Sequence, residues 1–196
     1  ALSEWKTLDA VSREQEKCLI CIQSLEIGLG AGIIIDGKMF DGASGFAGEV
    51  GYMGINFNGC FCNGRYRGSF ENYASTGSIC NYINENLYTS PGTQLNENSS
   101  YEDICTAYEH NDDLAIKAFD DLAWKLSYGL TSLIYILNPN RVILTDDYPR
   151  ERRFIDCVRQ NVIEMTGREI LGETIIEYSS LHQDTTILGG YYHVLD

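Results

Sequence analysis

The chain has 196 residues, of which 44% are hydrophobic, enough to bury one substantial core but not two large ones. It has 14 Lys and Arg residues and 28 Asp and Glu residues, which give a formal net charge of −14. Because so acidic a surface repels phosphate backbones, we expect this segment not to bind nucleic acid by itself. No apolar run reaches the length of about 18 residues that a membrane span needs, and the first residues do not resemble a signal peptide.

The chain contains seven cysteines, an odd number that would leave one unpaired in a disulfide framework. Apart from the close pair Cys60 and Cys62, they are scattered through segments typical of strands and helices. Cysteines in such segments usually behave as small buried hydrophobic residues. We therefore expect a reduced, cytoplasmic protein.

The first elements in chain order are mostly strands. Residues 1–6 are typical of the end of a helix, so we expect the chain to be a piece of a longer protein. Residues 18–25 predict a buried strand. Residues 33–40 predict a hairpin that turns at Asp36 and Gly37. A glycine-rich loop is predicted to follow over residues 41–68.

Helices dominate the rest of the chain. The strongest pattern spans residues 112–137, where apolar side chains recur every three or four positions up to the Asn-Pro-Asn sequence that begins at Asn138. The other predicted elements are helices over 70–87, 101–110, 150–165 and 186–195, strands over 141–145 and 174–178, and a polar loop over 89–100. Leading strands followed by alternating helices and strands predict an α/β domain with a mixed sheet.

Gly28, Gly30 and Gly32 follow the first predicted strand. Glycine permits close backbone approach and positive φ angles, as phosphate-binding loops require. The alternative interpretation is a tight connection between two strands.

The segment from Gly42 to Tyr52 is built almost entirely of small residues, with Glu49 as its only charged group. Such a segment suits a loop that wraps closely around a ligand. A carboxylate accepts hydrogen bonds from two neighbouring hydroxyls, as sugar recognition requires. The alternative is a solvated glutamate in a flexible loop.

The third motif runs from Cys60 to Glu71 and begins Cys-Phe-Cys-Asn-Gly. A Cys-x-Cys pair in a loop with glycine indicates half of a structural zinc site. No histidine or third cysteine lies nearby in sequence, so two free thiols are the alternative.

These three motifs, in this order, resemble the ROK family of sugar kinases and sugar-responsive repressors. That family has a Gly-Thr-Gly-Ile-Gly-Ala-Gly phosphate loop, a Gly-x-x-Gly-x-Ala-Gly-Glu-x-Gly-His segment and a Cys-x-Cys-Gly-x-x-Gly-Cys-x-Glu knuckle. The resemblance is carried by residues 18–75. It implies a fold of two actin-like, ribonuclease-H-like lobes, with residues 1–196 forming the C-terminal, sugar-sensing lobe. The other lobe and a winged helix-turn-helix domain would lie outside this chain.

The resemblance also implies a sugar site. Glu49 and Glu71 hold the positions of the two family glutamates that bind sugar hydroxyls, and Tyr52 holds the position of the family histidine. A phenol still forms hydrogen bonds with hydroxyls but is a poor zinc ligand.

The metal and nucleotide motifs are less complete. Cys60 and Cys62 remain, but the third family cysteine aligns with Ser69, so we expect a degenerate zinc site and no other cofactor. Glu26 replaces part of the phosphate loop and would repel phosphates. Asp146 stands where the family has glycine against the nucleotide. The family's catalytic Asp precedes a segment like residues 1–4 and would lie outside this chain, so we expect no enzymatic activity.

The leading hypothesis is a sugar-effector-binding and dimerisation domain of a ROK transcriptional regulator of carbohydrate genes, of the xylose or N-acetylglucosamine repressor type. Its expected partners are a small sugar or sugar phosphate, a second copy of the chain, and DNA only through a domain outside this chain. An ATP-dependent sugar kinase is the first alternative. A dimerisation module without a ligand is the second.

Overall fold

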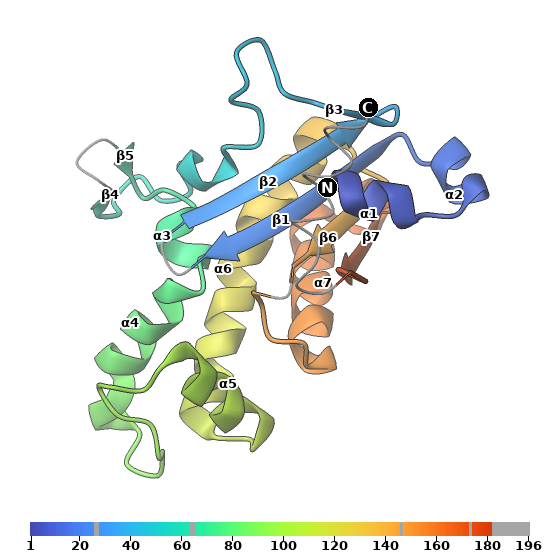
Figure 1. Ribbon diagram of the computed structural model, residues 1–196. Coiled ribbons are helices and arrows are strands. Elements are labelled where there is room, and N and C mark those ends of the chain that lie inside the picture. The colour runs from blue at the N-terminus through green and yellow to red at the C-terminus, as the bar shows by residue number, and fades with distance from the viewer. Residues whose placement is uncertain (26–27, 63–65, 146, 173, 182–196) are drawn as a thin grey trace.

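A computed structural model describes residues 1–25, 28–62, 66–145, 147–172 and 174–181. Its main sheet has the strand order β3-β2-β1-β6-β7 (Figure 1). The strands are β1 (Cys18–Leu25), β2 (Gly28–Ile35), β3 (Lys38–Met39), β6 (Arg141–Leu144) and β7 (Ile175–Tyr178). β1, β2 and β3 pair antiparallel, whereas β1, β6 and β7 run parallel. The predicted mixed sheet is therefore confirmed.

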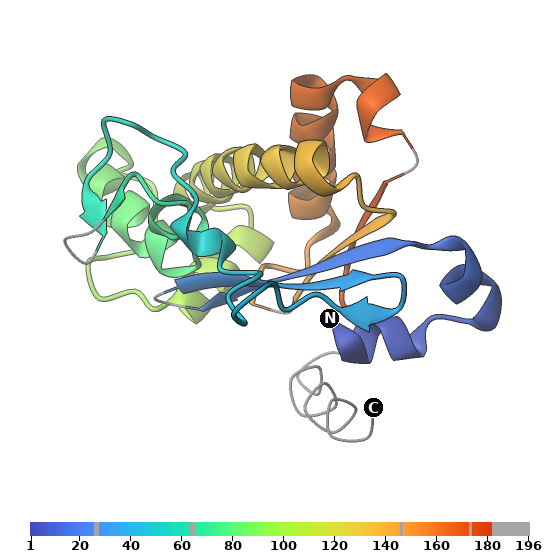
Figure 2. The same cartoon turned by 90° about the horizontal axis from the view of Figure 1, so that it is seen from above.

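The central strand β1 is buried on both faces. Ile20 and Ile22 point into the larger core, whereas Leu19 and Cys21 point into a smaller core with Trp5. Figure 2 shows the resulting layers, with α6 and α7 on one side of the sheet and α1 on the other. An unbroken apolar run such as Cys18–Ile22 is typical of a strand covered on both sides.

The helices are α1 (Leu2–Thr7), α2 (Ala10–Gln15), α3 (Glu71–Ala74), α4 (Gly77–Asn86), α5 (Tyr101–Glu109), α6 (Asp113–Leu137), α7 (Arg152–Thr166) and α8 (Arg168–Leu171). Short elements complete the fold: η1 (Val50–Tyr52), η2 (Leu87–Thr89), β4 (Phe61–Cys62) and β5 (Tyr66–Arg67). The long helix α6 is confirmed within a residue. It starts because the Asp112 carboxylate accepts the backbone N–H groups of Leu114 and Ala115, and it ends at Asn138 in a left-handed conformation.

The larger core is centred on α6 and its neighbours. The ring of Phe119 on α6 is fully buried and meets the rings of Tyr108, Tyr101 and Phe154 at centroid distances of 4.5, 6.3 and 6.0 Å. These side chains come from α5, α6 and α7, so the aromatic cluster joins three helices on one face of the sheet.

One predicted helix differs from the structure. The single helix predicted over 70–87 is wrong, because Ser75 is extended and separates α3 from α4. The break is stabilised by a buried hydrogen bond, which Thr76 N–H donates to Ser24 Oγ on β1 at 2.8 Å. Helix α2 was not predicted. The helix predicted over 186–195 lies outside the described residues.

Candidate functional site

The glycine-rich segment that precedes η1 lies directly on strand β2. The backbone N–H of Ala31 donates to the carbonyl of Gly48 at 2.8 Å. Gly48 has a φ of +92°, and a Cβ atom there would lie 2.0 Å from the carbonyl oxygen of Ala31. A Cβ atom on Gly51 would lie 2.3 Å from the carbonyl oxygen of Leu29. These contacts leave no room for side chains, so the glycines set the spacing between the loop and the strand.

The residues predicted to bind sugar meet around η1. Glu71 is the first residue of α3. Its Oε2 atom lies close to Gly51 in η1, because a Cβ atom added at Gly51 would be 3.1 Å from it. Glu49 precedes η1 and is exposed, and Tyr52 ends η1 with 46% of its surface exposed. The structure therefore brings Glu71 next to the element that carries Glu49 and Tyr52. Two carboxylates and a phenol can accept hydrogen bonds from several hydroxyl groups, and the phenol can also donate one.

Segment 53–69, of which the structure describes residues 53–62 and 66–69, is held mainly by its own backbone in those parts. Gly54 and Ser69 form an isolated β-bridge, and the N–H of Phe70 donates to the carbonyl of Met53 at 2.7 Å. The fully buried ring of Phe70 packs on α6 at Gly129, where a Cβ atom would lie 2.1 Å from the ring. The two ends of the segment are thus hydrogen-bonded to each other, and Phe70 packs the C-terminal end against the core.

The residues of this segment fit a structural zinc ion poorly. Zinc is held by a tetrahedral set of Cys, His or carboxylate ligands. Cys60 is exposed, and its Sγ accepts a hydrogen bond from the side-chain amide of Asn72 at 3.9 Å. Ser69 and Tyr52 occupy the positions at which the family has two further zinc ligands. Within the part of the chain that the structure describes, no group of three or more His, Cys, Asp or Glu residues is arranged to hold a metal. The side chain of Cys62 lies outside that part.

The predicted phosphate-loop glycines are strand residues. Gly28, Gly30 and Gly32 lie in β2 and pair with residues of β1, which agrees with the alternative of a connection between two strands. The two strands stay paired up to their facing ends, where Leu25 lies opposite Gly28. Glu26 and Asp146, which the sequence places against phosphate binding, both lie outside the described residues. The expected loss of nucleotide binding stays a prediction.

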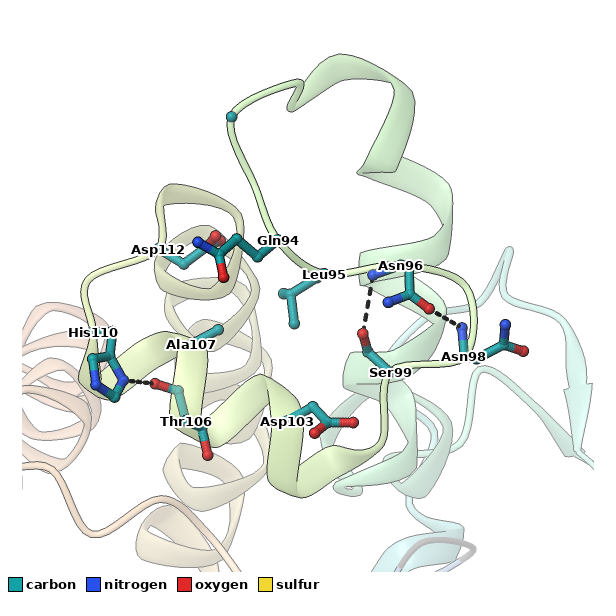
Figure 3. Close-up of a pocket in the computed structure, with 11 residues that line it drawn as sticks. Gln94, Leu95, Asn96, Asn98, Ser99, Asp103, Thr106, Ala107, His110 and Asp112 are labelled. Carbon is teal, nitrogen blue, oxygen red and sulfur yellow. Dashed lines mark hydrogen bonds between the residues drawn. The ribbon is translucent and has the colours of Figure 1, made fainter.

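Sequence reasoning missed a polar pocket at another end of the domain. Figure 3 shows it between the loop at residues 92–99 and helix α5, and its volume is about 570 Å³. Several lining groups serve local structure: the Ser99 hydroxyl accepts the N–H of Asn96, and Asp103 caps α5. The hydrogen bonds from Ser100 lower the pKa of Asp103 below its ordinary value. The run of Asn, Ser and Gly residues predicted a polar loop here, without indicating that it encloses a pocket.

Comparisons with known proteins agree with this architecture. Residues 3–196 match the profile of the ROK family. The xylose repressors of Bacillus subtilis and Caldicellulosiruptor bescii are 30% and 37% identical over 174 residues each, covering 88% and 85% of this chain and 43% of each repressor. The glucokinase of Thermotoga maritima is 25% identical over 175 residues, covering 85% of this chain and 55% of that enzyme. The chain thus spans less than half the length of these repressors.

Solved structures share the fold. A ROK transcriptional regulator described as a homologue of the Escherichia coli MLC protein superposes with a TM-score of 0.79 at 24% identity, over 96% of this chain and 48% of that one. A ROK glucokinase from Streptomyces griseus superposes with a TM-score of 0.78 at 22% identity, over 96% and 64% of the two chains. Among the described residues, no helix is long and apolar enough to cross a membrane. The mixed sheet, its flanking helices and the profile match together identify this chain as a member of the ROK family, with the actin-like ATPase fold.

Proposed function

We propose that this chain is the sugar-sensing domain of a transcriptional regulator of the xylose-repressor type, with residues 1–196 acting as one domain. The observation that supports the proposal most directly is that the carboxylate of Glu71 lies beside Gly51 in η1, the element that Glu49 immediately precedes. The similarity to two xylose repressors at 30% and 37% identity supports the choice of regulator and of sugar class.

In this proposal a small sugar lies against η1, with its hydroxyl groups donating to Glu49 and Glu71 and exchanging hydrogen bonds with Tyr52. The backbone positions of the three groups are set by their elements, since the segment that leads into η1 is hydrogen-bonded to β2 and Glu71 begins α3. A sugar shifts the regulator between two states only by its difference in affinity for them. We propose that the sugar favours the state with lower DNA affinity, and that DNA binding resides in a segment outside this chain.

The alternative is an ATP-dependent sugar kinase, which the similarity to the Thermotoga maritima glucokinase favours. A kinase must hold ATP in line with the sugar, because phosphoryl transfer depends on positioning and on charge stabilisation. ATP binding therefore separates the two functions.

The test is isothermal titration of the full-length protein with D-xylose, other pentoses and hexoses, N-acetylglucosamine and ATP. Glu49→Ala and Glu71→Gln are each expected to weaken sugar binding about 10- to 100-fold, because each removes hydrogen bonds to a charged acceptor. Glu97→Ala is the matched control, since Glu97 is an exposed glutamate on the distant polar loop.

Sugar binding without ATP binding, weakened by the two site variants alone, supports the sensor. ATP binding with turnover of a sugar replaces it with the kinase. Absence of binding to either ligand leaves the dimerisation module, which sedimentation of the full-length protein tests directly. We also propose that the regulator is a homodimer, and a monomer in that experiment would contradict this part.

A further inference from the structure

Asn56 is the centre of the hydrogen-bond network that shapes segment 53–69. Its backbone N–H donates to the carbonyl of Gly68 at 3.2 Å, and its carbonyl accepts the N–H of Gly59 at 3.1 Å. Its side-chain Oδ1 accepts the N–H of Asn58 at 3.0 Å. Its Nδ2 donates to the hydroxyl of Tyr73 at 3.0 Å. Each kind of polar group on Asn56 is therefore used within this network.

The glycines of the segment allow this close packing. Gly68 has a φ of +58°, and a Cβ atom there would lie 1.8 Å from the carbonyl oxygen of Asn56. A Cβ atom on Gly59 would lie 2.4 Å from the hydroxyl of Tyr73. Main chain and phenol thus meet directly, and side chains at these two positions would separate them.

Tyr73 connects this network to the rest of the domain. It lies in α3, two residues after Glu71, and the ammonium group of Lys125 on α6 lies 5.8 Å from its ring centroid. On the outer side of the segment, the guanidinium of Arg67 covers the ring of Phe61 at 4.1 Å. In Figure 1 the β4–β5 hairpin lies beside α3, at the same end of the domain as η1. A chain of contacts therefore runs from the hairpin through Asn56 and Tyr73 to the helix that begins with Glu71.

We propose that Tyr73 is a positioning residue, and that its hydrogen bond with Asn56 holds segment 53–69 against α3 in the role that a zinc ion would otherwise fill. The donor set supports this, because Ser69 and Tyr52 occupy positions where zinc would need stronger ligands. The positioning of Glu71 for a sugar rests on the proposed function above. The holding of the segment does not.

The test uses the full-length protein with Tyr73→Phe, Asn56→Ala and the double variant. Tyr73→Phe keeps the ring and removes only the hydroxyl, so we expect backbone amides at residues 55–62 and 66–68 to exchange hydrogen faster while those of α6 stay unchanged. Sugar affinity is expected to fall about fivefold, as for the loss of one neutral hydrogen bond. The double variant should lose no more than Asn56→Ala alone, because Asn56→Ala already removes the bond to Tyr73 together with the acceptor of the Asn58 N–H. Tyr88→Phe, at a tyrosine that is 88% exposed on η2, is the matched control.

A second arm asks whether metal contributes. Wild-type protein treated with the zinc chelator dipicolinic acid, and protein with added zinc, should show the same exchange at residues 55–62 and 66–68 and the same sugar affinity. Loosening of the segment by the chelator would overturn the proposal in favour of metal. Unchanged exchange in Tyr73→Phe would also overturn it, as would a drop in melting temperature that accounts for the whole affinity loss. If the wild-type protein binds no sugar, the proposed function and the positioning of Glu71 fail together, and the exchange data alone decide what holds the segment.

Discussion

Two regions of this domain are stabilised in opposite ways. The helical region around α6 is held by apolar side chains, with the fully buried ring of Phe119 beside three other aromatic rings. The region from residue 41 to η1 and the β4–β5 hairpin is held by backbone hydrogen bonds and by glycines that permit close contact. In the first arrangement, the burial of apolar surface stabilises the folded state. The second fixes the position of a loop with little buried surface, which suits a binding site.

The comparison separates two consequences of mutation. A change in the helical region is expected to lower the free energy of unfolding while the site of the folded protein stays intact. A change in the glycine-rich region is expected to alter the geometry of the site at a smaller cost in stability. Phe70, which follows the β4–β5 hairpin, joins the two regions through its contact with Gly129 on α6.

The largest expected effect follows from emptying the aromatic cluster. Phe119→Ala should lower the free energy of unfolding by about 3–5 kcal/mol, because it removes a buried ring and leaves a cavity. Denaturant unfolding measures this loss, and sugar titration of the folded protein should give an unchanged affinity. Phe57→Ala, at a ring that is 97% exposed, is the control and should leave stability unaltered. A large affinity loss in folded Phe119→Ala would contradict the separation of the two regions.

A smaller stability effect, with a stronger effect on binding, is expected at Gly48. Gly48→Ala and Gly45→Ala both place a side chain at positive φ, of +92° and +78°, at a cost of about 1–3 kcal/mol each. Only at position 48 does the new Cβ atom meet another atom, the Ala31 carbonyl oxygen. Gly48→Ala should therefore displace η1 and weaken sugar binding in titration. Gly45→Ala should retain affinity, and equal losses in the two variants would show that backbone strain rather than the clash is responsible.

The smallest effect concerns pH and Asp103. Hydrogen bonds from the backbone and hydroxyl of Ser100 lower the pKa of Asp103 below its ordinary value of 3.8. Its contribution to stability is therefore complete above that ordinary value and is lost as the pH falls through the lower pKa of the folded state. Asp103→Asn should make the melting temperature less sensitive to acid below about pH 4. Glu102→Gln removes a carboxylate from the same turn without touching the cap, and an identical flattening in that variant would contradict the assignment to Asp103.

Much of the fold was predictable because its elements carry strong local patterns. The apolar spacing over 112–137 predicted α6, and the apolar run at Cys18 predicted β1. The break between α3 and α4 was not predictable, because it depends on Ser24, a residue 52 positions away from Thr76 in the chain. In the candidate site, the motifs indicated Glu49 and Glu71 but not the network around Asn56. That network combines backbone hydrogen bonds with the side chains of Asn56 and Tyr73, in close contacts that Gly59 and Gly68 make possible. The partners lie up to 17 positions apart in the chain and form no local sequence pattern.

The segment over Gly48–Tyr52 has a consequence for how the domain can evolve. Its glycines at 48 and 51 press against β2, while Glu49 and Tyr52 between and after them face outward. Constraints from folding and from ligand choice therefore alternate along the same few residues instead of coinciding. Under the proposed function, substitutions at 49 and 52 change which sugar is preferred without rebuilding the loop, whereas the contacts of Gly48 and Gly51 with β2 leave no room for a side chain. A common scaffold with replaceable recognition positions lets descendants acquire new preferences by single steps.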